Sequence, residues 1–284
     1  MHPRRLAPIA LPLLLASSVV AATGSVAGAA PKQQPLRILV TNDDGVDAPG
    51  IDTLVRALRK VPGVQVTVVA PATSQTGASD KTTPGELQAT RSTTGGVAST
   101  AVAGFPADTV NYALDTLKLK PNLVISGINA GSNVGPGVPQ SGTIGAARTA
   151  ARRGLPALAV SQGFVTDLGE ISDYAPGARA AVKWLKEHRK ALASKGKQVE
   201  AFVDNLNVPT CAAGTKPRGT LEVPIGTESN YIDPQDCAST VPAPATDVSA
   251  LLAGYTTLTP SIPFLITQPR SSSRSVTLSR SSTA

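Results

Sequence analysis

The chain has 284 residues, enough for one large domain or two small ones, and only 3% of them are aromatic. Ala, Gly, Val and Leu dominate the apolar content, which favours small-residue helices packed on Val/Ile/Leu strands. The formal net charge is +7, but no Lys/Arg stripe interleaves with aromatic residues, which argues against a nucleic-acid platform.

The N-terminus has the pattern of a secretory leader. Arg4 and Arg5 precede an apolar run over residues 6–22, and Ala27, Gly28 and Ala29 offer a small-residue cleavage site. We therefore expect a signal peptide over residues 1–30 and a secreted or extracytoplasmic protein, with an uncleaved membrane anchor as the alternative. No later segment is long and apolar enough to predict a membrane span.

The cysteine content of the sequence bears on whether the protein contains a disulfide or a zinc site. The chain has only two cysteines, Cys211 and Cys237, and an exported protein would be expected to pair them in one disulfide. Two free thiols are the alternative. A zinc site is disfavoured, because there is no Cys-x-x-Cys spacing and only two His residues in the whole chain.

The first half of the chain opens with a strand, a turn and a helix. Residues 36–40 form an apolar run that ends in a polar tip with two adjacent carboxylates, Asp43 and Asp44. Ile51, Leu54, Val55 and Leu58 then share one face of a helix. Ligands of open α/β sheets bind beyond the carboxyl ends of the strands, and a divalent cation relieves repulsion between neighbouring carboxylates. This stretch therefore predicts a metal site.

The rest of the chain alternates between strand and helix patterns. Further strands are predicted at residues 64–70, 97–103, 122–126, 157–160, 201–208 and 254–260, and helices at 106–117, 144–153, 177–188 and 246–253. Residues 81–100 predict a loop or hairpin, and 210–245 predict extended segments with little helix. The Ser/Arg-rich residues 268–284 are expected to be disordered.

Several polar residues follow the predicted strands. Thr76 and Gly77 follow the second strand, Asn129 and Asn133 lie in a glycine-rich loop, and residues 141–143 open the next helix. If the strands are parallel, all of them share one edge of the sheet. Their oxygen ligands favour Mg²⁺, Mn²⁺ or Ca²⁺, and a helix N-terminus after a glycine-rich loop favours an anion. Together they indicate a phosphoryl-transfer site, although each alone is also typical of a turn or an N-cap.

Six motifs carry a resemblance to a known family. They are RILVTNDDGVDAPGI at residues 37–51, VAP at 69–71, TGAS at 76–79, GFPAD at 104–108, SGINAG at 126–131 and SGT at 141–143. With them, the chain resembles the SurE (survival protein E) family of metal-dependent 5′/3′-nucleotidases and acid-phosphatase-like phosphohydrolases, over residues 36–266. The resemblance implies an α/β fold: a Rossmann-like three-layer sandwich with a mainly parallel sheet and an irregular, β-rich C-terminal extension. The domain would span residues 31–266, followed by the tail at 267–284.

The resemblance also assigns roles to residues. Asp43 and Asp44 would be catalytic and, with Thr76 and Asn129, would bind one divalent metal ion, Mg²⁺ or Mn²⁺, with Ca²⁺ as a further candidate. The phosphate-binding positions would be Gly77, Asn133, Ser141, Gly142 and Thr143. Thr76 stands where the family usually has a serine. The attacking group would be either Asp43 or a water molecule activated by the metal and a carboxylate, and the family forms dimers or tetramers.

These observations lead to one expected function and two alternatives. The expectation is an exported, divalent-metal-dependent phosphomonoester hydrolase acting on nucleoside monophosphates as small-molecule substrates. The first alternative is a degenerate relative that binds phosphate or nucleotide without catalysis. The second is a surface or cell-wall interaction protein that uses its basic Ser/Arg tail.

Overall fold

The computed structural model describes residues 35–164, 173–193, 199–242 and 244–263. The expected signal peptide at residues 1–30 and the expected tail at 267–284 lie outside the described residues. Within the described ranges, no helix combines the length and the apolar character needed to cross a bilayer.

A single mixed sheet of nine strands organises the described part of the chain, in the order β3-β4-β2-β1-β5-β6-β7-β9-β8. The strands β4, β2, β1, β5, β6 and β7 are parallel to one another, β3 pairs antiparallel with β4, and β9 pairs antiparallel with β7. The strand bounds are β1 Leu36–Thr41, β2 Val64–Pro71, β3 Ala89–Thr94, β4 Val97–Val102, β5 Leu123–Ala130, β6 Ala157–Gln162, β7 Val203–Val208, β8 Thr220–Glu222 and β9 Thr256–Thr259.

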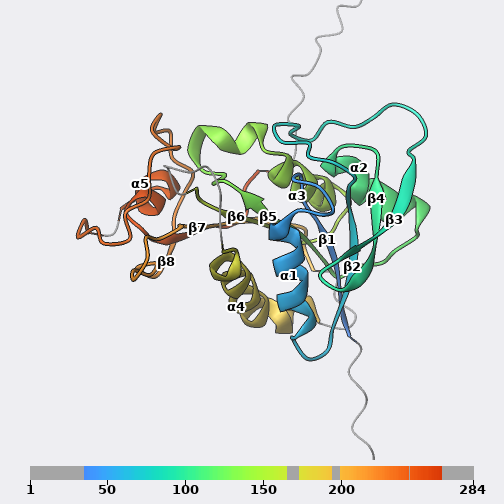
Figure 1. The fold of residues 1–284 in the computed structure, drawn as a ribbon, viewed down its shortest axis with the longest axis horizontal. Helices are drawn as coiled ribbons and strands as arrows, with labels where there is room; N and C mark the ends of the chain where they lie inside the picture. The colour runs from blue at the N-terminus through green and yellow to red at the C-terminus, as the bar shows by residue number, and fades with distance from the viewer. Residues whose placement is uncertain (1–34, 165–172, 194–198, 243, 264–284) are drawn as a thin grey trace, which may run out of the picture. The chain divides into compact units, whose positions relative to one another are not determined.

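Helices cover both faces of this sheet. Figure 1 shows α1 and α4 side by side on one face and α2 and α3 on the other. The helix bounds are α1 Pro49–Arg59, α2 Pro106–Asn111, α3 Gly142–Arg152, α4 Ala175–Leu192 and α5 Asp247–Leu252. A π-helical turn, Tyr112–Thr116, follows α2, and a 3-10 helix, Gly135–Gln140, precedes α3.

The alternation of side chains along β1 explains the layering. Ile38 and Val40 are buried in the cluster that contains the apolar face of α1 and Trp184 of α4. Leu39 is buried in a second cluster with Ile144 of α3. Successive strand residues point to opposite faces, and a parallel sheet is buried on both, so the two clusters form two cores. The predicted three-layer α/β fold is confirmed.

Two local predictions differ from the structure. The predicted strand 122–126 continues to Ala130, so the first residues of the expected glycine-rich loop belong to β5; they pair with β6 after a shift in register between Ser126 and Asn129. The predicted helix 106–117 is α-helical only to Asn111 and then widens into the π turn. Regular hydrophobic spacing does not reveal either event, because both depend on backbone pairing with neighbouring elements.

The C-terminal part adds an irregular extension to the sheet. Cys211 and Cys237 form a disulfide with a sequence separation of 26, as expected. Thr246 caps α5, its side chain accepting a hydrogen bond from the N–H of Ser249. The antiparallel strand β9 then extends the sheet beyond β7 and pairs with the short β8.

Candidate functional site

Two acidic side chains follow directly on β1, at the edge where the parallel strands end. Asp43 is only 2% exposed. Burial raises the pKa of its carboxyl, and the hydrogen bond from Thr143 opposes this rise. Burial also raises the pKa of Asp44 to about 7, and the neighbouring charge of Asp43 adds to it. These two carboxylates therefore create a place where a cation would be stabilised.

The loop after β2 lies against this acidic pair through its backbone. The N–H of Gln75 donates to the carbonyl oxygen of Asp43 at 2.7 Å. The next residue, Thr76, is exposed, and its hydroxyl lies 3.2 Å from that of Ser74. Gly77 follows, also exposed, with a φ of 77°. The structure thus brings the segment of Thr76 and Gly77 to the acidic pair.

Asn129, near the end of β5, lies on the other side of Asp44. Its side chain is largely buried, and its Nδ2 donates to the carbonyl oxygen of Gly131 at 2.7 Å. This bond leaves the side-chain oxygen as the atom able to bind a cation. The N–H of the next residue, Ala130, donates to Oδ2 of Asp44 at 3.1 Å, so β5 contacts the acidic pair directly.

The N-terminus of α3 contacts Asp43. Ser141 caps this helix by accepting the N–H of Ile144 at 3.1 Å. The hydroxyl of Thr143 donates to Oδ1 of Asp43 at 2.5 Å. At Gly142 an added Cβ would lie 2.8 Å from Cβ of Asp43, so only glycine allows this approach. The helix therefore presents its positive end to the carboxylate edge, an arrangement that also suits a phosphate.

Asn133 belongs to a buried polar network beside this helix. Its Nδ2 donates to the hydroxyl of Ser161 at 2.8 Å and lies 3.4 Å from that of Thr143. Its backbone N–H donates to Oδ1 of Asn207 at 2.7 Å, and its carbonyl oxygen accepts from Nδ2 of Asn205 at 2.8 Å. The side-chain nitrogen of Asn133 is thus engaged within the protein, and the residue connects the loop before α3 to β6 and β7.

Sequence reasoning did not assign Ser161, Asn207 or Tyr174 to the site. Ser161 and Asn207 lie near the ends of parallel strands β6 and β7 and hold Asn133. Tyr174 precedes α4; its burial, followed by the charge of Asp44, raises the pKa of its hydroxyl to about 12. Ser161 and Asn207 could have been found from the sequence, because each is a polar residue near the carboxyl end of a predicted strand. No feature of the sequence indicated Tyr174.

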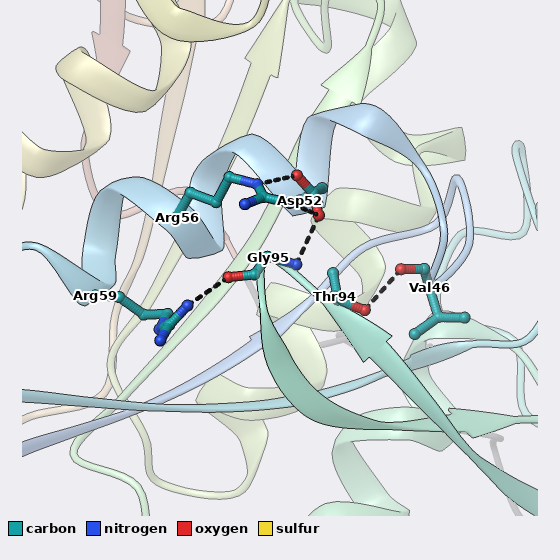
Figure 2. Close-up of polar contacts among 6 residues, drawn as sticks. All are labelled: Val46, Asp52, Arg56, Arg59, Thr94 and Gly95. Atoms are coloured by element: carbon teal, nitrogen blue, oxygen red, sulfur yellow. Dashed lines mark hydrogen bonds and ion pairs between the residues drawn. The ribbon is translucent and has the colours of Figure 1, made fainter.

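The hairpin formed by β3 and β4 supports the loop that carries the acidic pair (Figure 2). The hydroxyl of Thr94, at the end of β3, donates to the carbonyl oxygen of Val46 at 2.9 Å. The adjoining turn is held to α1, since the N–H of Gly95 donates to Oδ1 of Asp52 at 2.7 Å and Arg59 donates to the Gly95 carbonyl oxygen at 2.7 Å. The hairpin therefore fixes the backbone two residues beyond Asp44.

The chemistry of these donors fits a hard divalent cation. The candidate ligands offer two carboxylates, one amide oxygen and one hydroxyl, all of them oxygens. Among the described residues no group of three or more His, Cys, Asp or Glu side chains is placed to hold a metal. A cation here would therefore depend on the pair Asp43 and Asp44 together with neutral oxygens from Asn129 and Thr76.

Comparison with known proteins gives a consistent result. The family model described as "Survival protein SurE" matches residues 38–227. The chain is 40% identical to the 5′-nucleotidase SurE of Desulfovibrio desulfuricans over 179 residues, which are 62% of this chain and 67% of that protein. It is 46% identical to the 5′-nucleotidase SurE of Xanthomonas campestris pv. campestris over 149 residues, 52% of this chain and 56% of that protein. The aligned part thus spans little more than half of the Xanthomonas relative.

A solved structure is similar over a greater length. The crystal structure of the SurE protein from Aquifex aeolicus superimposes with a TM-score of 0.64 at 26% sequence identity. The match covers 81% of this chain and 94% of that one. The similarity therefore extends over most of the α/β fold of this chain.

Proposed function

The chain belongs to the SurE family, and from this we propose that it is a divalent-metal-dependent phosphomonoester hydrolase of the 5′-nucleotidase type, acting on nucleoside monophosphates. The observation that carries the proposal is the contact between Asp43 and the N-terminus of α3, through the hydroxyl of Thr143. It places a carboxylate pair suited to a cation beside a helix end suited to a phosphate.

In this proposal Asp43, Asp44, Asn129 and Thr76 hold the cation. A divalent cation bound there would supply charge neutralisation for the phosphoryl group and would lower the pKa of a water molecule. The phosphate oxygens bind at the positive N-terminal end of α3, where the hydroxyl of Ser141 can donate to them. Gly77 is assigned to the same phosphate site from the family resemblance. Positioning and charge stabilisation then provide most of the rate enhancement.

A water molecule is the proposed attacking group. Oδ1 of Asp43 accepts the hydroxyl of Thr143, and its Cβ and Oδ2 lie against Gly142, so this side chain is held in place by α3. We therefore assign this side chain the roles of cation ligand and proton acceptor. Acid quench during turnover of ³²P-labelled AMP distinguishes the two routes: a phosphorylated protein that is lost in Asp43→Asn would instead identify Asp43 as the nucleophile.

An activity assay with residues 31–284 tests the proposal. We expect hydrolysis of AMP with Mn²⁺ or Mg²⁺, and its loss when EDTA removes the metal. Asp43→Asn should lower kcat by at least about 100-fold without changing the circular dichroism spectrum. Absence of turnover with any divalent metal between about pH 5 and 9 would contradict catalysis. Metal and AMP binding by calorimetry without turnover would indicate the non-catalytic alternative.

Export and assembly are part of the proposal. The Cys211–Cys237 disulfide supports an extracytoplasmic location, because disulfides persist mainly in oxidising compartments. N-terminal sequencing of protein recovered from outside the cytoplasm should find a start just after residue 29 or 30. A homo-oligomer, dimer or tetramer, is proposed from the family resemblance, and light scattering coupled to size-exclusion chromatography measures it.

A further inference from the structure

An exposed aromatic side chain lies beside the candidate site. Phe164 is 43% exposed and follows β6 at the same edge of the sheet as the acidic pair. Its ring lies over Gly131: a Cβ at that position would be 2.5 Å from Cε2 of the ring and 2.6 Å from Cζ. Gly131, with a φ of 113°, thus leaves the space that the ring occupies.

The ring of Phe164 is linked to the acidic pair through the backbone at the end of β5. Gly131, which the ring contacts, accepts the side-chain N–H of Asn129 on its carbonyl oxygen at 2.7 Å. Between them, the N–H of Ala130 donates to Oδ2 of Asp44 at 3.1 Å. A ligand whose phosphate lies near Asp44 would therefore have the ring of Phe164 within the reach of its remaining part.

The backbone that carries Phe164 is held firmly. The N–H of Gly163 donates to the carbonyl oxygen of Val208 at 2.9 Å, and the Gly163 carbonyl oxygen accepts the hydroxyl of Thr210 at 2.5 Å. The N–H of Thr210 also donates to Oε1 of Gln235 at 3.3 Å. Thr210 directly precedes Cys211, and Gln235 lies two residues before Cys237, so the crosslink supports this position. A surface held in place before binding loses little entropy when a ligand contacts it.

A single exposed apolar side chain is common on protein surfaces, so only its position beside the candidate site suggests a role for Phe164. In the described part of the chain the other large exposed hydrophobic side chains are Leu117, Ile232 and Val241, none of them aromatic. Phe164 alone among these four combines a π face with contact to Gly131, whose carbonyl oxygen accepts the side chain of Asn129. Every nucleobase can stack on such a face, and a phenyl ring has no hydrogen-bonding group with which to select one base.

We propose that Phe164 is the platform on which the base of a nucleoside monophosphate stacks while its phosphate lies at the N-terminus of α3. This rests on the proposed function and extends it to a residue that determines substrate class. The protein should accept different bases, with purines bound more tightly than pyrimidines because they offer more stacking area.

The test compares two substrates that differ only by the base, AMP and ribose 5-phosphate. Phe164→Ala should raise KM for AMP by about tenfold, with kcat little changed, and leave both constants for ribose 5-phosphate as in the wild type. Phe164→Tyr keeps the ring and should behave like the wild type with both. Thermal unfolding of each variant checks that the fold is retained.

Three results would overturn the proposal. They are an unchanged KM for AMP in Phe164→Ala, an equal loss for the two substrates, and a Phe164→Tyr variant as impaired as Phe164→Ala. If the wild type hydrolyses neither substrate, the proposed function fails separately. Calorimetric binding of AMP and ribose 5-phosphate then tests the platform, which predicts tighter binding of AMP that Phe164→Ala removes.

Discussion

At the scale of single residues, the bond between Thr143 and Asp43 joins the two halves of the candidate site. It links the turn after β1 to a helix 100 positions later. Because Asp43 is buried, its orientation depends on this donor and on the close approach of Gly142. In metalloproteins, mutation of a residue that orients a metal-binding side chain commonly lowers metal affinity by about 10- to 100-fold.

Thr143→Val therefore tests that partner directly. The substitution keeps the shape of the side chain and removes the hydroxyl that donates to Asp43. If Asp43 binds the cation as proposed, we expect Mn²⁺ affinity and kcat/KM to fall by about 10- to 100-fold, the usual loss on removing an outer partner of a metal ligand. Thr143→Ser keeps the hydroxyl and should retain most of both. If calorimetry shows that Thr143→Val binds Mn²⁺ as tightly as the wild type does, Asp43 does not need the hydroxyl of Thr143 to bind the cation.

The raised pKa of Asp44 predicts how pH affects the metal-free protein. Its carboxyl has a pKa of about 7 when folded, against an ordinary value of 3.8, so between these values the folded state binds more protons than the unfolded state. Stability conferred by this group is present below about pH 4 and is lost as pH rises to about 7. Asp44→Asn removes the ionisation and should raise Tm at about pH 8 but not at about pH 4.

The metal supplies a control for this pH prediction. Mn²⁺ added at about pH 8 should raise Tm of the wild type, because a cation offsets the buried charge. The same addition should have much less effect on Asp44→Asn. Equal Tm values for the two metal-free proteins at both pH values would mean that burial does not disfavour the Asp44 carboxylate.

At the scale of elements, the β3–β4 hairpin acts as a support for the loop after β1. Thr94 is 1% exposed, and its hydroxyl reaches the backbone of Val46 across the sheet edge (Figure 2). Asp52 and Arg59 of α1 hold the adjoining turn at Gly95. The acidic pair is therefore held from two sides, by this hairpin and by α3.

Thr94→Val measures the contribution of the hairpin. The loss of the buried hydroxyl leaves the carbonyl oxygen of Val46 without this donor, and we expect the free energy of unfolding to fall by about 1–3 kcal/mol. The neighbouring Thr93 is exposed, so Thr93→Val should change it by less than about 0.5 kcal/mol. Urea unfolding of both variants gives the comparison. Equal urea midpoints for the two variants would contradict a supporting role of the Thr94 hydroxyl.

At the scale of the whole molecule, the disulfide ties the irregular C-terminal extension together. It closes a segment with a sequence separation of 26 that contains little regular structure besides the short β8. Such a segment has few buried apolar side chains of its own, so the crosslink contributes by limiting the unfolded chain. The bridge also adjoins Thr210, which holds Gly163 at the sheet edge.

Replacing both cysteines, Cys211→Ser with Cys237→Ser, should lower the free energy of unfolding by about 3 kcal/mol. Reduction of the wild type should have a similar effect, which urea unfolding with and without a reductant would show. The double variant should be insensitive to the reductant and serves as the control. An unchanged midpoint after verified reduction would show that the extension is stable without its crosslink.

The sequence alone determined the layered α/β architecture and the segments that meet at the sheet edge. The apolar run at residues 36–40, the helical spacing from Ile51 to Leu58 and the turn at Asp43 and Asp44 are local patterns, so they can be read from neighbouring residues. The expected disulfide followed from the number of cysteines and the expected leader, and the structure confirms the pairing.

Only the tertiary structure decided how those segments contact one another. It placed the hydroxyl of Thr143 on Asp43, turned the side chain of Asn133 toward Ser161, and set the ring of Phe164 over Gly131. Each of these contacts joins residues far apart in the chain. Such contacts follow from the strand order and from the register of β5 on β6, which no local spacing encodes.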